Sequence, residues 1–135
     1  MVEMSVVYLG EKHCELTHGP SKSKIETDAP KDNMGRGENF SPTDLVGAAL
    51  ASCVLTTMAI MAEKGSLNFK GATANVSKEM QASPRQIARL PVTVNMPKGL
   101  SAEDRKRLEA AAHTCPVHRS LSPEVQAPIT FNYQD

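Results

Sequence analysis

The sequence contains no tryptophan, and it has only three phenylalanines and two tyrosines in 135 residues. Proteins that bind single-stranded nucleic acid stack bases on aromatic side chains, and this chain offers few of them. It also lacks an excess charge of either sign, because fifteen basic side chains balance fifteen acidic ones. Nucleic-acid-binding domains usually carry a basic surplus. We therefore expect no nucleic-acid partner.

Cysteine is scarce as well, with Cys14, Cys53 and Cys115 as the only three. A small, odd number is too thin for the disulfide framework that stabilises many secreted domains. The first fifteen residues contain an early acid and only a short apolar alternation, so they do not resemble a signal peptide. We therefore expect a cytoplasmic protein with one or two functional thiols. The length predicts a single domain, 1–135.

The clearest element in the sequence is the apolar segment SPTDLVGAALASCVLTTMAIMAEKG, residues 41–65. Ser41 is a good helix N-cap, Pro42 suits the first helical position, and Asp44 stands where a capping box needs an acceptor. Gly65 supplies a stop signal. These features predict one long helix.

This helix carries no charged residue between Leu45 and Ala62, so a membrane span has to be considered. The stretch is barely long enough to cross a bilayer, and glycine, serine, threonine and several alanines interrupt it. A helix that is apolar on nearly every face is more typical of a central helix covered on all sides. We expect no membrane partner, and in a chain this short a second subunit could complete the cover.

Short alternating segments surround the long helix. Before it, the pattern predicts a strand pair over 2–8 and 11–17, a third strand over 23–30, and a polar loop. After it come two strands over 69–81 and 85–97, a capped helix over 101–115, a short helical turn, and an edge strand near the C-terminus. This order of elements predicts an α+β fold.

Cys53 lies well inside the apolar helix, where the simplest interpretation is a small buried hydrophobe. A position in the middle of a helix is far from the positive end of its dipole. A reactive Cys53 would therefore need another group, such as an arginine or a histidine, to stabilise its thiolate.

Cys115 precedes a proline that suits the first position of a helical turn, so Cys115 itself is expected to be the N-cap. Its sulfur would then face the N–H groups of Val117 and His118, which predicts a lowered thiol pKa.

The motif HTCPVHRS also permits a metal site with the ligands His113, Cys115 and His118. The available distant donors are His13, Cys14, His18 and Cys53. None of them forms a C-x-x-C pair, so redox chemistry explains the motif better and no metal is expected.

The loop GRGENF places Arg36 between two glycines, with Glu38 close behind. A flexible solvated turn is the common form of such a loop. A guanidinium here could also stabilise a thiolate or hold a peroxide oxygen.

Three parts of the chain together resemble the OsmC/Ohr family of osmotically inducible and organic hydroperoxide resistance proteins. They are SPTDLVGAALASC, the alternating strands after it, and EAAAHTCPVHRSL. The resemblance covers essentially the whole chain, and DAPKDNMGRGENFSPTDL resembles the broader OsmC-like branch. It implies an OsmC-like fold, in which antiparallel sheets wrap around long central helices in an intertwined homodimer.

The resemblance also implies a thiol-dependent peroxidase, a cysteine-based hydroperoxide reductase without metal, flavin or other cofactor. Cys53 would be the peroxidatic thiol, which attacks an organic hydroperoxide and becomes a sulfenic acid. Cys115 would be the resolving thiol, which forms a Cys53–Cys115 disulfide. An external dithiol, typically of the lipoyl type, would reduce this disulfide. Hydrogen peroxide would be a slower substrate.

The sequence departs from the family pattern around the first cysteine. Family members usually carry a glutamate ten residues before it, where this chain has Thr43 next to Asp44. Their arginine comes from the N-terminal strands, whereas Arg36 is the first arginine of this chain. Arg36 with Glu38 or Asp44 is therefore the candidate activating group. The other candidates are Arg85 and Arg89.

The altered network leaves a second function open. The chain could be an OsmC-fold binding protein with little or no peroxidase activity, which holds an apolar ligand at the dimer interface. Cys14 matches no motif of the family and is expected to be a strand residue.

Overall fold

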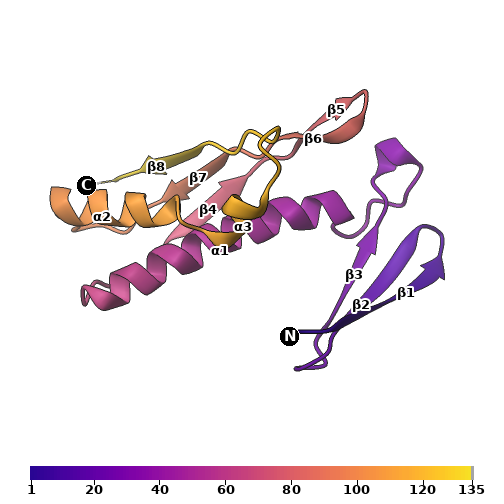
Figure 1. The fold of residues 1–135 in the computed structure, drawn as a ribbon, viewed down its shortest axis with the longest axis horizontal. Coiled ribbons are helices and arrows are strands. Elements are labelled where there is room, and N and C mark those ends of the chain that lie inside the picture. Colours follow the sequence, from indigo (N-terminus) through magenta and orange to yellow (C-terminus); the bar gives the residue numbers. More distant parts are fainter. Residues whose placement is uncertain (135) are drawn as a thin grey trace. The chain divides into compact units, whose positions relative to one another are not determined.

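A computed structural model describes residues 1–134 of the chain (Figure 1). The contacts within the chain fall into two compact units, Met1–Val46 and Gly47–Asp135. The assignment of the whole chain to one domain stays a prediction.

The N-terminal unit is built on an antiparallel sheet of order β1–β2–β3, with bounds Met4–Gly10, His13–His18 and Lys24–Asp28. Glu11 and Lys12 both have positive φ, 55° and 57°, as a two-residue hairpin turn requires. The predicted strand pair and third strand are confirmed. The first two strands begin two residues later than predicted, because the turn lies at Glu11 and Lys12, whereas the predicted strands leave residues 9 and 10 for it.

A polar loop follows the sheet and contains one short 3₁₀ turn, η1 (Lys31–Asn33). The helix α1 (Pro42–Lys64) then begins in the N-terminal unit and continues into the C-terminal unit. The capping box is confirmed: the Ser41 N–H donates to Asp44 Oδ2 over 2.9 Å, and the Asp44 N–H donates to Ser41 Oγ over 3.0 Å. This reciprocal pair fixes where α1 starts.

The C-terminal unit contains a sheet of order β4–β7–β8, with bounds Thr73–Val76, Val92–Asn95 and Ile129–Asn132, and a hairpin of β5 (Glu79–Ala82) and β6 (Arg85–Arg89). The two strands predicted over 69–81 and 85–97 are each divided into two strands. Pro91 explains the division, because it has no N–H for the ladder and only accepts from the Ser77 N–H over 3.2 Å. Pairs β4–β7 and β5–β6 are antiparallel, while β7–β8 is parallel.

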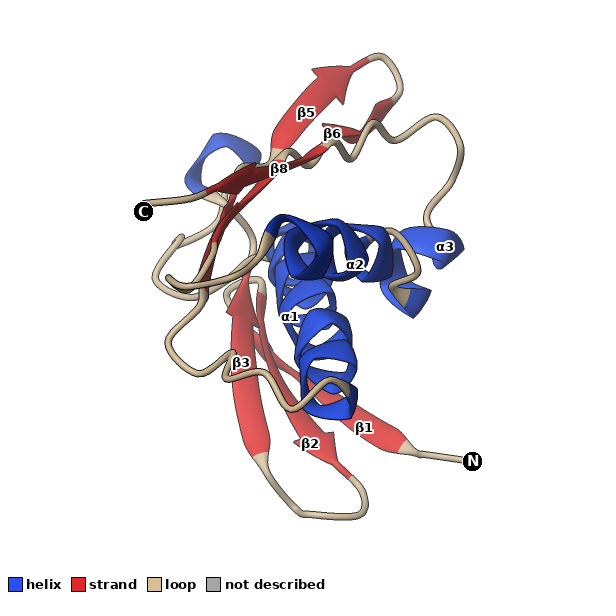
Figure 2. Cartoon of the chain, turned by 90° about the vertical axis from the view of Figure 1, so that its left-hand side faces the viewer, coloured by secondary structure: helices blue, strands red, loops and turns tan. Residues whose placement is uncertain are grey.

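Two further helices follow, α2 (Ala102–Ala112) and α3 (Pro116–Ser120). Ser101 caps α2 by accepting from the Asp104 N–H over 3.1 Å, as predicted, but α2 ends three residues before Cys115. Within the C-terminal unit, α1 and α2 lie along the β4–β7–β8 sheet (Figure 1 and Figure 2). The order of elements confirms the predicted α+β class.

The core of the C-terminal unit is aliphatic. Fully buried side chains come from α1 at positions i, i+4 and i+8, from the segment through β7, and from α2: Leu50, Val54, Met58, Leu90, Val92, Val94 and Leu108. Gly47 marks a close approach of α1 to β4 and to the residue after β6, since a Cβ there would lie 3.7 Å from Val76 Cγ2 and 3.3 Å from Leu90 Cδ2. The core therefore packs against one face of α1 and fixes the position of the helix within the unit.

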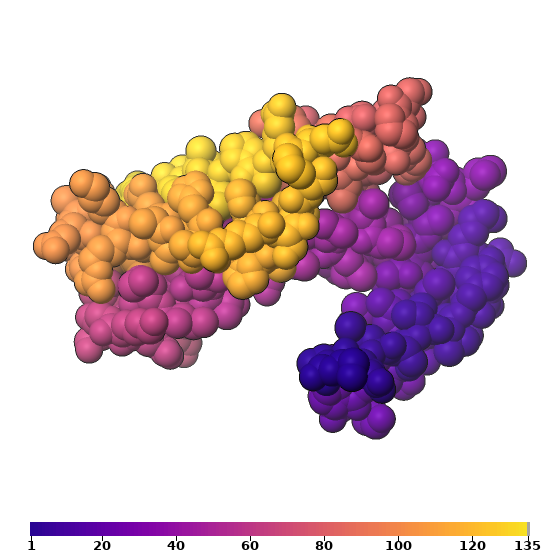
Figure 3. All heavy atoms as spheres, viewed as in Figure 1, coloured from indigo at the N-terminus to yellow at the C-terminus, as the bar shows by residue number. Residues whose placement is uncertain are grey.

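The rest of α1 is much less covered. By length and composition α1 could cross a membrane. Of its most apolar stretch, 33% is buried inside the protein. In the space-filling view α1 remains visible beneath α2 and α3 (Figure 3). A helix with this composition needs a further covering surface.

Candidate active site

The two cysteines chosen from the sequence lie together in the C-terminal unit. Cys53 is half-buried on α1, and Cys115 is fully buried at the start of α3. Their thiols hydrogen-bond to each other although 62 residues separate them (115 − 53). Both are free thiols, so the structure shows the reduced pair.

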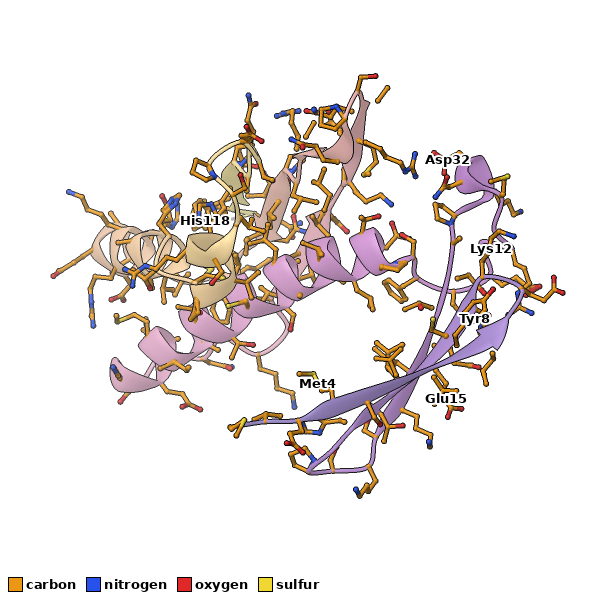
Figure 4. The ribbon with its side chains drawn as sticks, turned by 45° about the vertical axis from the view of Figure 1, so that its right-hand side comes forward. Met4, Tyr8, Lys12, Glu15, Asp32 and His118 are labelled. Carbon is orange, nitrogen blue, oxygen red and sulfur yellow. The ribbon has the colours of Figure 1, made fainter. Side chains whose placement is uncertain are left out.

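Cys115 is the N-cap of α3, as the Cys-Pro sequence predicts. Its Sγ accepts a hydrogen bond from the His118 N–H over 3.4 Å, and Pro116 occupies the first helical position. The His118 ring reaches the other way and donates from Nε2 to the Ala127 carbonyl over 3.1 Å (Figure 4). The Gln126 N–H in turn donates to the Ala88 carbonyl on β6. His118 thus ties α3, a helix with no buried residue of its own, to a segment that is fixed to the strands.

The surroundings of Cys53 favour its thiolate. Burial alone would raise the pKa of Cys53, but hydrogen bonds from the Cys115 thiol, the Val117 N–H and the Thr57 hydroxyl lower it below its ordinary value. The sequence predicted an arginine or a histidine for this task. The groups that lower the pKa of Cys53 are instead all uncharged.

The surroundings of Cys115 have the opposite effect, and the prediction of a lowered pKa for this thiol was wrong. Burial and the hydrogen bond to Cys53 raise the pKa of Cys115, and the N–H groups of His118 and Val117 only partly oppose them. The side chain is 0% exposed, so desolvation outweighs its N-cap position. Of the two thiols, Cys53 therefore ionises first.

Arg36 has its own partners in the N-terminal unit. Its Nε and Nη2 atoms donate to Asp28 Oδ1 over 3.2 and 3.1 Å, and Glu38 Oε2 lies 3.6 Å from Nε. The glycine before Arg36 is required by packing, because a Cβ on Gly35 would lie 1.8 Å from the Ala29 carbonyl oxygen. The loop around Arg36 is therefore an ordered turn, in contrast to the flexible one that its composition indicates.

Asp28, the last residue of β3, is the common partner of this loop, and sequence analysis did not identify its role. It is fully buried and accepts from His13 Nδ1 over 2.7 Å, and from both the backbone N–H and the side chain of Asn39 over 3.0 Å. Burial would raise the pKa of Asp28, but the hydrogen bonds from His13, Asn39 and Arg36 hold it well below its usual range. Hydrogen bonds to Asp28 and Glu26 raise the pKa of His13. We call His13, Asp28, Arg36 and Asn39 the Asp28 cluster.

The remaining candidates lie at other places. Asp44 serves the capping box of α1, and Thr43 Oγ1 lies 3.2 Å from Ser41 Oγ. Arg89 pairs with Glu79 over 2.9 Å, and Arg85 opens β6. That Arg36, Glu38, Asp44, Arg85 or Arg89 serves Cys53 stays a prediction.

The histidines of HTCPVHRS have other contacts. The His113 ring packs edge-on against the rings of His118 and Phe131, with centroid distances of 6.5 and 6.4 Å. Residues 1–134 contain no group of three or more histidine, cysteine or acidic side chains arranged to hold a metal ion.

Cys14 lies in β2 opposite Tyr8 and Thr27, which confirms that it is a strand residue.

The fold and the site define an α+β protein with one thiol on a long central helix and a second thiol at the cap of a later helix. A family model described as OsmC-like protein matches residues 35–130. The chain belongs to this family, and the predicted OsmC-like fold is confirmed.

Solved structures support the same family. A candidate osmotic stress induced and detoxification response protein from Psychrobacter arcticus is 36% identical, with a TM-score of 0.93 over 98% of this chain and 96% of that one. An OsmC-like protein from Mycoplasma pneumoniae (15%, TM-score 0.83) shares the fold over 100% of this chain and 98% of that one. An organic hydroperoxide resistance protein from Elizabethkingia anophelis (15%, 0.75) does so over 99% and 96%. No curated protein matches significantly.

Proposed function

We propose that the protein is a thiol-dependent peroxidase that reduces organic hydroperoxides in the cytoplasm, and hydrogen peroxide more slowly. The observation that carries this proposal is the asymmetry of the thiol pair. Cys53 has a lowered pKa and is partly accessible, while Cys115 has a raised pKa, is buried, and already contacts Cys53. Family membership and relatives that are named for hydroperoxide resistance support a role in peroxide stress.

The reaction needs only the two thiols and an external reductant. The Cys53 thiolate attacks one peroxide oxygen, the O–O bond breaks, and the second oxygen leaves as an alcohol after taking up a proton. Cys53 is then a sulfenic acid. The Cys115 sulfur attacks the Cys53 sulfur, the thiol gives up its proton, and the sulfenic oxygen leaves as water. A dithiol, for which we propose the lipoyl type, then reduces the disulfide by exchange.

The burial of Cys115 suits the resolving role. A raised pKa keeps this thiol protonated at neutral pH, so it does not compete with Cys53 for the peroxide. Its hydrogen bond to Cys53 places it next to the sulfur on which the sulfenic acid forms. Only a short approach is then needed to close the disulfide.

This proposal is tested by counting free thiols on the reduced protein before and after one equivalent of cumene hydroperoxide, with mass analysis of the peptides. We expect the loss of two of the three thiols and a Cys53–Cys115 bridge, with Cys14 still free. If both thiols remain titratable, the peroxidase is rejected, and the OsmC-fold ligand-binding protein becomes the better proposal.

We further propose that the protein acts as a homodimer in which α1 of each chain covers the other. Exposed positions on α1 follow one helical face, at spacings of three and four residues: Ala49, Ser52, Thr56 and Ile60. In the N-terminal unit, apolar side chains of β1 such as Met4 and Tyr8 are also more than half exposed (Figure 4). Apolar surface of this extent is typical of an interface.

Ala49→Arg is expected to dissociate the dimer. A charge without a partner in an apolar interface would weaken association by roughly 100-fold or more, which corresponds to about 3 kcal/mol. Light scattering after size exclusion measures the mass. The matched control is Ala110→Arg, the same change at an exposed position of α2. Equal masses for both variants and the unmodified protein would contradict the interface.

A further inference from the structure

One side chain that lowers the pKa of Cys53, Thr57, has no part in the reaction steps given above. Thr57 lies one helical turn after Cys53 on α1, and its Oγ1 is 3.9 Å from Cys53 Sγ. Both side chains are half-buried, so this contact is partly shielded from water. Residues four apart on a helix lie on the same face, which fixes the hydroxyl beside the sulfur. The next hydroxyl, that of Thr56, is exposed on another face.

The surroundings of Cys53 make this hydroxyl important. The other two groups that lower its pKa are the Val117 N–H, which belongs to the backbone, and the Cys115 thiol. The Cys115 proton is lost when the disulfide forms, so this donor changes during each turnover. Thr57 is the side-chain donor at Cys53 that keeps its proton throughout. A hydroxyl on a thiolate is a charge-assisted hydrogen bond, which is stronger than a bond between neutral groups.

We propose that Thr57 is a third catalytic residue of the site. Its hydroxyl donates a hydrogen bond to the Cys53 thiolate and stabilises this reactive form of the side chain. This role rests on the proposed peroxidase function, although the hydrogen bond itself does not depend on it. It gives the site an uncharged donor next to the reacting sulfur. A hydroxyl inside a helix often bonds instead to the carbonyl four residues earlier, and the experiment separates these two uses.

The experiment follows the alkylation of Cys53 by iodoacetamide across the pH range, read for the Cys53 peptide by mass spectrometry. Thr57→Val keeps the shape of the side chain but removes the hydroxyl. We expect its apparent pKa for Cys53 to rise, so that alkylation at pH 7 slows by about tenfold, a shift of about one pH unit. Thr57→Ser, which keeps the hydroxyl, is expected to react like the unmodified protein.

The control is Thr73→Val, which removes an exposed hydroxyl on β4, outside the proposed dimer face of α1, and is expected to leave the profile unchanged. The proposal is overturned if Thr57→Val gives the same profile as Thr73→Val, because the hydroxyl then serves only the helix backbone. It is also overturned if Thr57→Ser reacts as slowly as Thr57→Val. Thr57→Ala replaces the valine variant if a thermal melt shows that valine disturbs folding.

A single-turnover measurement with cumene hydroperoxide separates this proposal from the proposed function. The rate of Cys53 oxidation at pH 7 is expected to fall about tenfold in Thr57→Val, in parallel with alkylation. If the unmodified protein does not react with the peroxide but its alkylation still depends on the Thr57 hydroxyl, the peroxidase fails and the thiolate donor is supported. If the peroxide reacts but neither rate depends on Thr57, the catalytic role of Thr57 fails alone.

Discussion

Cys53→Ser is expected to abolish peroxide reduction, with a loss of at least about 1,000-fold in rate. A serine hydroxyl does not ionise near neutral pH and cannot become a sulfenic acid, so neither step of the proposed cycle has a substitute. Consumption of cumene hydroperoxide with dihydrolipoamide as the reductant measures turnover. Turnover at the normal rate by this variant would show that the peroxide reacts elsewhere in the protein.

Cys115→Ser is expected to behave differently, because it removes the resolving step but leaves the attacking thiol. It should reduce one peroxide per site and then stop as a Cys53 sulfenic acid, which dimedone traps. Cys115→Ala should be slower than Cys115→Ser in that first turnover, because alanine removes a hydrogen-bond donor that lowers the pKa of Cys53. Cys14→Ser is the control and should keep full activity, since Cys14 lies in β2 of the N-terminal unit.

Local signals allowed the sequence to predict much of the helical structure correctly. Ser41 and Asp44 lie within one turn of each other, and so do Cys115 and Pro116, so their caps depend on a few neighbouring residues. Strand division at Pro91 could also have been predicted from the missing N–H of proline. The pairing of Cys53 with Cys115 could not, because it depends on contacts across the fold. It came from the resemblance to a family.

The electrostatics of the site were harder to predict. The N-cap position of Cys115 indicated a lowered pKa, but its burial, which comes from tertiary packing, raises it. Thr57 was missed although its spacing of four residues from Cys53 was available. Asp28 was missed for a different reason: it faces His13 because of the register between β2 and β3, which alternating sequences do not specify on their own.

The Asp28 cluster also changes how Arg36 is interpreted. The sequence offered Arg36 as a mobile guanidinium for Cys53, whereas the structure gives it a buried carboxylate as its partner. A carboxylate in this position restricts the motion of the Arg36 side chain and offsets its positive charge. The groups that lower the pKa of Cys53 within its own unit are uncharged, and a role of Arg36 at Cys53 stays a prediction.

Asp28→Ala is expected to destabilise the N-terminal unit strongly. Four donor groups, from His13, Arg36 and the backbone and side chain of Asn39, would lose their shared acceptor, and two of these side chains are positively charged when His13 is protonated. Removing one partner of a buried, hydrogen-bonded charge is among the most damaging changes in a folded protein. Urea unfolding followed by circular dichroism should show a midpoint lower by roughly 1 M or more.

Glu26→Ala provides the matched control for this variant. Glu26 contacts the same His13 ring over 2.9 Å, but its side chain is 50% exposed and the pair is open to solvent. Exposed ion pairs contribute little to stability, so this variant should unfold close to the unmodified protein. Limited proteolysis should cut Asp28→Ala faster within residues 29–40, because the Asn39 N–H and Arg36 hold that loop to Asp28. If the two variants have equal urea midpoints and equal cleavage rates, the loop is held by its backbone hydrogen bonds instead, such as the bond from Gly37 N–H to the Ala29 carbonyl.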